Sequence, residues 1–176
     1  MRHKNINEVT HQWMLENLTI DSIVVDATMG NGHDTLFLSN HSKKVYAFDI
    51  STQAYNETQK KVSHKNNVVL LLDSHEHMDN HIHQSIAGVV FNCGYLPNSD
   101  HTSVTTKTTT IRALDKAKDL LENHGWICIT VYVGHDGGKQ EAKSVLDWLK
   151  SNTRIEKIYT YDNVLRAPIA YFARLQ

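Results

Sequence analysis

The chain has 176 residues, of which 40% are hydrophobic and 21% are charged, and its formal net charge is −1. This composition is typical of a folded globular protein and excludes a disordered, collagen-like or low-complexity chain. The near-neutral charge provides no overall attraction to nucleic acids or anionic membranes, so a polyanionic partner has to be held by a local patch.

Strands and helices are predicted to alternate along one domain that spans residues 1–176. The first element is an amphipathic helix at Ile6–Leu18, in an N-terminal segment (residues 1–20) that packs on the rest of the domain. A short β-branched run then ends at Asp26 and is followed at once by a tight turn and a helix. The later strands are expected at Lys44–Asp49, Val68–Leu72, Ile86–Asn92, Trp126–Val133, Ile155–Tyr161 and Ile169–Arg174. The later helices are expected at Thr52–Val62, near Val104–Asn123 and from about Lys139 to Lys150, with a short polar helix or loop at Ser74–His83.

This alternation indicates right-handed strand–helix–strand units and a mostly parallel sheet that is covered on both faces. We therefore expect an α/β protein with a Rossmann-like, doubly wound sheet of seven strands. The last two strands have no helical pattern between them and are expected to form an antiparallel hairpin. Ligands of such sheets bind beyond the carboxyl ends of the strands, and the chemistry is expected there.

Membrane attachment and secretion are not expected. The longest apolar stretches, Val68–Leu72 and Trp126–Val133, are far shorter than the roughly 20 residues of a membrane-spanning helix. The N-terminal residues lack the apolar core of a signal peptide, and Cys93 and Cys128 form neither a disulfide framework nor a paired-cysteine metal motif. The sequence thus predicts a cytoplasmic protein.

The turn after the first strand is predicted to bind a cofactor. Asp26, Gly30 and Gly32 form the pattern D-x-x-x-G-x-G, in which glycines permit a sharp turn and a helix N-terminus offers unpaired N–H groups. Thr35 stands where a dinucleotide fingerprint needs a third glycine, which argues against NAD. A carboxylate in the turn suits a ligand with a cationic end, such as the ammonium of a methionine moiety. The alternative is a purely structural turn.

Acidic residues close the next two strands as well. Asp49 ends the second strand, where a carboxylate can accept hydrogen bonds from both ribose hydroxyls, or else cap the following helix. Asp73 ends the third strand and is followed by Ser74 and His75, which are placed for an adenine edge or simply for an exposed loop. Together with Asp26 these residues indicate a trench for an adenosine-containing ligand with a cationic tail.

The fourth strand leads into a motif that points to methyl transfer. Asn92 and Tyr95 form N-x-x-Tyr, which resembles the Asn-Pro-Pro-Tyr element of amino-directed, S-adenosylmethionine-dependent methyltransferases, with Cys93 and Gly94 in place of the prolines. The Asn92 carbonyl can hold the N–H groups of an amine without a charge that keeps the amine protonated. Tyr95 can stack on a base drawn from single-stranded RNA. The alternatives are a turn-forming asparagine and a half-buried aromatic residue.

Three segments carry a closer resemblance: VVDATMGNGHDTLFL (24–38), FNCGYLPNSDHTSVTT (91–106) and VYVGHDGGKQE (131–141). They are similar to the small bacterial MnmM (YtqB) family, once described as rRNA methylases. The resemblance implies methylation of the amine of 5-aminomethyl-2-thiouridine at the tRNA wobble position, with S-adenosylmethionine as cofactor and the tRNA anticodon stem-loop as partner. A homodimer is left open.

The site residues expected from these motifs fall into three groups. Those expected to bind the cofactor are Asp26, Thr28, Gly30, Asn31, Gly32, His33, Asp34, Thr35, Asp49, Ile50, Gln53, Asp73, Ser74 and His75. Those expected to be catalytic are Asn92 and Tyr95. Those expected to bind the substrate are Leu96, Pro97, Ser103, Thr105, Thr106, Lys107 and His135.

Several points stay open in the sequence. A base for removing the proton from the amine is not evident, and Asp100, His101 and His135 are candidates only because they lie in loops near the motifs. Hydroxyls at Ser103–Thr110 beside Arg112, Lys116 and Lys118 suit a phosphate-contacting surface or a capped, solvated helix. His77 and His81 lie one helical turn apart but lack a third ligand, so no metal is expected. Other activities that fit are an rRNA or small-molecule methyltransferase and a non-catalytic module that binds adenosine ligands.

Overall fold

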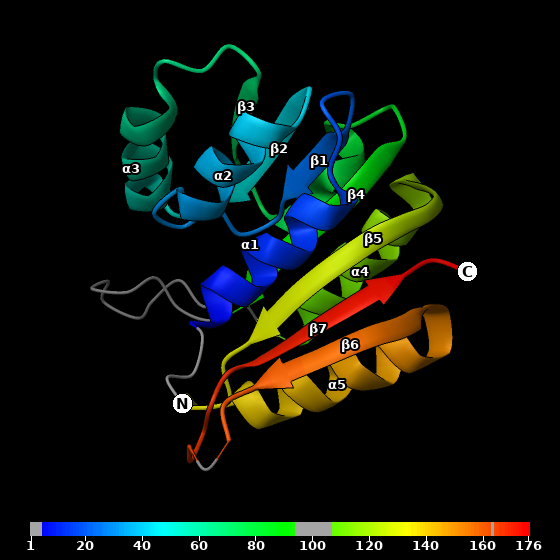
Figure 1. The fold of residues 1–176 in the computed structure, drawn as a ribbon. Coiled ribbons are helices and arrows are strands. Elements are labelled where there is room, and N and C mark those ends of the chain that lie inside the picture. The colour runs from blue at the N-terminus through cyan, green and yellow to red at the C-terminus, as the bar shows by residue number, and fades with distance from the viewer. Residues whose placement is uncertain (1–4, 94–106, 163) are drawn as a thin grey trace.

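The computed structural model describes residues 5–93, 107–162 and 164–176. Its strands are β1 (Ile23–Asp26), β2 (Lys44–Asp49), β3 (Val68–Leu72), β4 (Ile86–Cys93), β5 (Leu121–Val131), β6 (Arg154–Thr160) and β7 (Ile169–Arg174). Its helices are α1 (Ile6–Asn17), α2 (His33–His41), α3 (Thr52–Val62), α4 (Lys107–Leu120), α5 (Gly138–Asn152) and a short 3₁₀ helix η1 (His75–Asn80). The strands form one seven-stranded sheet in the order β3-β2-β1-β4-β5-β7-β6 (Figure 1).

The strand pairing confirms the predicted fold class. β3, β2, β1, β4 and β5 pair in parallel, and β7 lies antiparallel between β5 and β6. The chain first builds the sheet outward from β1 through β2 to β3 and then returns to place β4 on the other side of β1. The strand order reverses between β1 and β4, and in doubly wound sheets the ligand crevice lies at that point.

Alternating side chains of the strands face two hydrophobic cores. Val24 packs with buried residues of α1 and α2, whereas its neighbour Val25 packs with buried residues of α4 and α5. Figure 1 accordingly shows α1 and α2 on one face of the sheet and α4 and α5 on the other. The period of two along each strand, combined with helices that bury one stripe each, explains why both faces are covered.

One glycine in β4 is needed for packing between strands. A Cβ atom added at Gly88 would lie 1.9 Å from the Trp126 ring on β5, well inside van der Waals contact. Trp126 itself is 2% exposed and packs edge-on against Trp13 of α1, with ring centroids 5.9 Å apart. The missing side chain at residue 88 therefore makes the space for the indole that holds α1 on the sheet.

The prediction of helix through Asn123 is wrong, because α4 ends at Leu120 and β5 begins at Leu121. Leu121 pairs with Ile86 of β4 and is 9% exposed, so pairing with a distant strand overrides the local helical pattern. His124 has a φ of 63°, a left-handed conformation that continues neither a helix nor a regular strand. β5 also ends at Val131, earlier than the predicted Val133.

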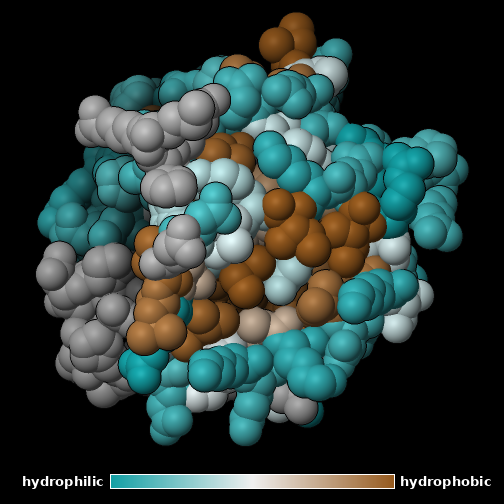
Figure 2. Space-filling view, turned by 60° about the horizontal axis from the view of Figure 1, so that its bottom comes forward, coloured by the Kyte–Doolittle hydropathy of each residue, from teal (hydrophilic) through white to brown (hydrophobic). Residues whose placement is uncertain are grey.

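Figure 2 presents the face at the bottom of Figure 1, where α5, β6 and the β6–β7 connection lie. Hydrophobic residues gather there in patches between hydrophilic ones (Figure 2). In the β6–β7 connection, Val164 is 52% exposed and Leu165 is 90% exposed. Among the helices that the structure describes, none has both the length and the apolar character needed to cross a bilayer.

Candidate functional site

The turn after β1 is anchored to both neighbouring strands. The Ala27 N–H donates to the Val90 carbonyl of β4 at 2.9 Å, and the Met29 N–H donates to the Phe48 carbonyl of β2 at 2.9 Å. These bonds extend the sheet pairing past the last residue of β1. The turn is therefore held at the strand-order reversal, at the carboxyl ends of β2 and β4.

The glycines of the turn adopt conformations that other residues rarely adopt. Gly30 has a φ of 50° and Gly32 a φ of 76°, and Gly32 is the N-cap of α2. A Cβ on Gly32 would lie 2.9 Å from Thr58 Oγ1 of α3, so the close packing also requires glycine. No side chain caps α2, which leaves its first N–H groups available to an anionic ligand group, as the sequence predicts.

Asp26 is buried beneath this turn. Its side chain accepts hydrogen bonds from Thr35 Oγ1 at 2.6 Å and from the Thr28 N–H at 3.2 Å, and the residue is 1% exposed. The pKa of Asp26 is raised to about 8, mainly by burial and secondly by the nearby Asp34 carboxylate. Both oxygens of Asp26 thus hold the turn in shape, and direct contact with the ammonium of a ligand stays a prediction.

Asp49 ties the end of β2 to the same turn. Asp49 Oδ2 accepts from the Gly30 N–H at 3.1 Å, and its Oδ1 accepts from the Ser51 N–H at 2.9 Å. Ser51, not Asp49, supplies the N-cap of α3 through its side chain. Beside Asp49, Ile50 is 58% exposed and Leu72, at the end of the neighbouring β3, is 51% exposed. Two apolar side chains at this polar edge can form a platform for a planar ring.

The histidines that follow β3 bind a carboxylate or a carbonyl. Asp73 Oδ1 accepts from His77 Nδ1 at 2.9 Å, and Asp73 Oδ2 accepts from His81 Nε2 at 2.8 Å. The bonds to His81 and His77 hold the pKa of Asp73 down, at about 2. His75 is 6% exposed and contacts the Ala27 carbonyl through Nδ1 at 2.9 Å, and burial lowers its pKa. Within residues 5–93, 107–162 and 164–176, no three metal-ligating side chains cluster.

Asn92 lies at the end of β4, next to the turn. Its N–H donates to Thr28 Oγ1 at 2.6 Å, and its side-chain Nδ2 donates to Asp34 Oδ2 at 3.5 Å. Because a carboxylate only accepts hydrogen bonds, this contact turns the amide nitrogen toward Asp34 and the amide oxygen away from it. Asn92 Oδ1 is buried and makes no hydrogen bond with any of the described residues. An unpaired buried acceptor is costly and indicates a place for a donor from a ligand.

His11 of α1 contacts Asp34 in this part of the site, which the sequence did not predict. His11 Nε2 lies 2.7 Å from Asp34 Oδ1, and the His11 ring stacks on Phe37 with centroids 4.0 Å apart. The side chains of His11 and Asp34 are 26% and 12% exposed. The only signal in the sequence was a histidine within an amphipathic helix, which does not indicate a partner in another element.

For several of the predicted site residues, all or part of the residue lies outside the part of the chain that the structure describes. Tyr95, Leu96, Pro97, Asp100, His101, Ser103, Thr105 and Thr106 lie outside the described residues. Lys107 begins α4, but its side chain also lies outside the description. His135 lies in the connection between β5 and α5, and its Nδ1 contacts the Asp136 carbonyl at 2.9 Å.

Three cations of α4, Arg112, Lys116 and Lys118, pair with acceptors on neighbouring elements. Arg112 lies 3.1 Å from Glu76, and Lys116 lies 2.6 Å from Asp79 of η1. Lys118 donates to Asn152 of α5 at 2.8 Å. The predicted phosphate-contacting surface therefore holds fewer available positive charges than the sequence suggests.

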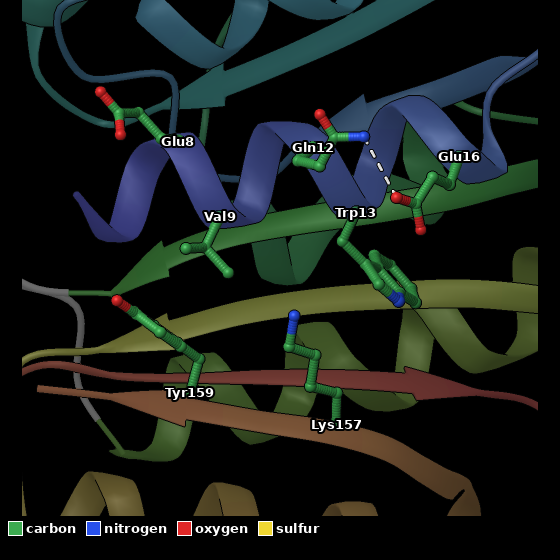
Figure 3. A pocket seen from close by; sticks show the side chains of 7 residues that line it. All are labelled: Glu8, Val9, Gln12, Trp13, Glu16, Lys157 and Tyr159. Atoms are coloured by element: carbon green, nitrogen blue, oxygen red, sulfur yellow. Dashed lines mark hydrogen bonds between the residues drawn. The ribbon is translucent and has the colours of Figure 1, made fainter. Parts of the chain in front are cut away.

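A separate groove of about 300 Å³ lies between α1 and β6 (Figure 3). Its lining is mixed, with hydrophobic, acidic and basic side chains. The lining residues are Glu8, Val9, Gln12, Trp13, Glu16, Lys157 and Tyr159. None of the predicted site residues that the structure describes lines this groove, so the turn after β1 remains the candidate site.

Comparison with known proteins finds similarity to proteins that are described as RNA methylases or methyltransferases. The model of the family described as "Putative rRNA methylase" matches residues 45–169. The chain is 32% identical over 158 residues to the Arabidopsis thaliana protein named "tRNA (mnm(5)s(2)U34)-methyltransferase, chloroplastic"; the match covers 81% of this chain and 58% of that protein. The chain therefore spans a little over half the length of this relative.

Two solved structures are similar over nearly the full chain. A protein from Clostridium thermocellum described as a "putative rRNA-methylase" is 33% identical with a TM-score of 0.89, covering 99% of this chain and 100% of that one. A "putative methyltransferase" from Streptococcus mutans, solved in complex with SAH, is 34% identical with a TM-score of 0.90 and the same coverage.

Proposed function

The chain belongs to the family described as "Putative rRNA methylase", and on that basis we propose that it is an S-adenosylmethionine-dependent N-methyltransferase. We propose as its substrate the aminomethyl group of 5-aminomethyl-2-thiouridine at the tRNA wobble position. The observation that carries the proposal is Asn92 Oδ1, a buried acceptor with no partner among the described residues, at the strand-order reversal of a class I methyltransferase fold.

The residues around the turn fit this cofactor. The left-handed glycines and the uncapped N-terminus of α2 suit the carboxylate end of a methionine moiety. We expect Asp49 to accept hydrogen bonds from the ribose hydroxyls, and we expect the exposed side chains of Ile50 and Leu72 to contact the faces of the adenine. When bound, S-adenosylmethionine supplies an electrophilic methyl group on a sulfonium. The complex of the Streptococcus mutans protein with SAH supports this choice.

Positioning is the main contribution of the protein to methyl transfer. The reaction is an in-line displacement, so its rate depends on close approach and alignment of a neutral amine. Asn92 is fixed by Thr28 through its backbone and by Asp34 through its side chain. Its amide oxygen can accept an amine N–H and aim the nitrogen lone pair. The neutral amide adds no charge that would stabilise the ammonium form.

The substrate assignment is supported by two similarities. One is the resemblance of segments 24–38, 91–106 and 131–141 to the MnmM family. The other is the printed name of the Arabidopsis thaliana relative, whose product nucleoside is the methylated form of the proposed substrate. The family description instead names rRNA, which makes rRNA the second candidate. Both candidates use the same cofactor site.

The test is methylation by the purified protein of tRNA that carries 5-aminomethyl-2-thiouridine, with mass spectrometry of the nucleosides. We expect conversion to 5-methylaminomethyl-2-thiouridine, and we expect Asn92→Ala to lose turnover while it retains cofactor affinity. The matched control is Asn40→Ala, which changes an exposed asparagine at the far end of α2. Methylation of rRNA but not of tRNA would contradict the substrate. Binding of S-adenosylmethionine without any methyl transfer would indicate a non-catalytic module.

A further inference from the structure

The contacts of Asp34 suggest a role in the reaction that neither motif nor cofactor explains. Asp34 is the second residue of α2, and its two oxygens face two other elements: Oδ1 contacts His11 of α1 at 2.7 Å, and Oδ2 contacts Asn92 of β4 at 3.5 Å. Among the described residues, no lysine or arginine pairs with it. Its carboxylate lies next to the side chain of Asn92, whose Oδ1 is buried and has no partner among those residues.

We propose that Asp34 is the proton acceptor for the amine substrate and that His11 is the positioning residue that holds Asp34. The inference rests on the proposed function, because it requires an amine that arrives as an ammonium ion. It answers the question of the base, which the sequence leaves open.

The two carboxylate oxygens of Asp34 have different partners. His11 Nε2 donates to Oδ1 and keeps the carboxylate in place, because a carboxylate only accepts. Oδ2 makes one long contact to the Asn92 amide, which leaves it capacity to accept a further hydrogen bond. An ammonium at this end of β4 has two acceptors on neighbouring side chains, Asp34 Oδ2 and Asn92 Oδ1. One acceptor is charged and can take a proton, whereas the other is neutral and can only orient.

The negative charge of Asp34 raises the pKa of three nearby groups. After burial, Asp34 is the second cause that raises the pKa of Asp26 at the end of β1, of Cys128 on β5 and of Tyr132 just after β5. None of these three groups offers a positive charge to compensate the carboxylate. A cationic substrate would therefore be favoured at this position.

The substrate ammonium gives one proton to the Asp34 carboxylate, which becomes neutral as the ammonium becomes a neutral amine. The amine nitrogen then uses its lone pair to take the methyl group and becomes a secondary ammonium, and the electron pair of the broken carbon–sulfur bond stays on sulfur, which loses its positive charge. The Asp34 side chain is 12% exposed, so its proton can pass directly to water.

The stacking partner of His11 supplies a matched control. His41 also contacts the Phe37 ring, with centroids 4.8 Å apart, but its Nδ1 contacts the Phe37 carbonyl and not a carboxylate. Substitution of His41 changes a histidine of the same cluster without touching Asp34. An effect of His11→Gln that His41→Gln reproduces would therefore be a packing effect.

The experiment measures kcat, KM and cofactor affinity of the wild type, Asp34→Asn, His11→Gln and His41→Gln between pH 7 and 9.5. At pH 7 we expect Asp34→Asn to lower kcat on the order of 100-fold or more, with unchanged affinity for SAH. The neutral fraction of an aliphatic amine rises about tenfold per pH unit below its pKa. The loss in Asp34→Asn should therefore shrink toward pH 9.5, which a structural defect would not produce. His11→Gln should show a smaller loss with the same recovery, and His41→Gln should match the wild type.

Two results would overturn the inference while leaving the proposed function intact. One is an Asp34→Asn enzyme that loses SAH affinity but keeps kcat at saturating cofactor, because Asp34 would then be a cofactor ligand. The other is a loss that is constant across the pH range in an active enzyme. If Asp34→Asn fails to fold, the pH dependence of His11→Gln decides in the same way. An inactive wild type would instead refute the proposed function, so the two failures are distinguishable.

Discussion

Replacing Asp26 by asparagine should make the stability of the protein less dependent on pH. In the folded protein burial raises the pKa of Asp26 from 3.8 to about 8. Between these values the folded state keeps a proton that the unfolded state releases. The contribution of Asp26 to stability should therefore be most favourable below about pH 4, fall as the pH rises toward 8, and stay level above it.

The size of the effect follows from the shift. A change of about four pKa units at about 1.4 kcal/mol each corresponds to a ceiling on the order of 5 kcal/mol, which structural relaxation will reduce. Asp26→Asn has no ionisation to suppress, and Thr35 Oγ1 can rotate to accept from the new amide. Relative to the wild type, the variant should thus gain free energy of unfolding as the pH rises from 4 to 8.

The assay is urea unfolding at intervals between pH 4.5 and 9, with the difference in free energy between variant and wild type as the readout. The control Asp21→Asn removes a carboxylate at an exposed position and should give a difference that does not vary with pH in this way. A flat difference for Asp26→Asn from pH 5 to 8.5 would refute the assignment of a raised pKa to this buried carboxyl.

Three further predictions concern neighbouring features. Asp73→Asn should destabilise the protein above about pH 4, with the difference disappearing as the pH falls toward 2, because the folded pKa of Asp73 is about 2; acid titration followed by circular dichroism tests this. Gly88→Ala should cost about 1–3 kcal/mol or more in urea unfolding, since its Cβ would meet Trp126 at 1.9 Å, and wild-type stability would contradict that packing. Thr28→Val removes the acceptor for the Asn92 N–H and should cost about 1–3 kcal/mol. It should also lower kcat more than SAH affinity in the methylation assay, and the opposite order would argue against positioning through Thr28.

Local patterns in the sequence were sufficient for the fold. The predicted bounds of β2, α3 and β3 match the structure because the two strands are short apolar runs between polar residues and the helix buries one residue per turn. The glycines at residues 30 and 32 predicted a sharp turn, and in the structure both have a positive φ. These features depend on neighbours in the chain, so the sequence alone contains them.

The alignment of side chains in the candidate site was decided by the tertiary structure. The contacts of Asp34 with His11 and Asn92 join residues that are 23 and 58 positions apart. Burial of the Asp26 carboxyl and the strand conformation at Leu121 likewise depend on packing against distant segments. These hydrogen bonds, this burial and the raised pKa of Asp26 depend on segments that are distant in the sequence and pack together only in the folded chain. The local pattern of apolar and polar residues does not specify which distant side chains meet.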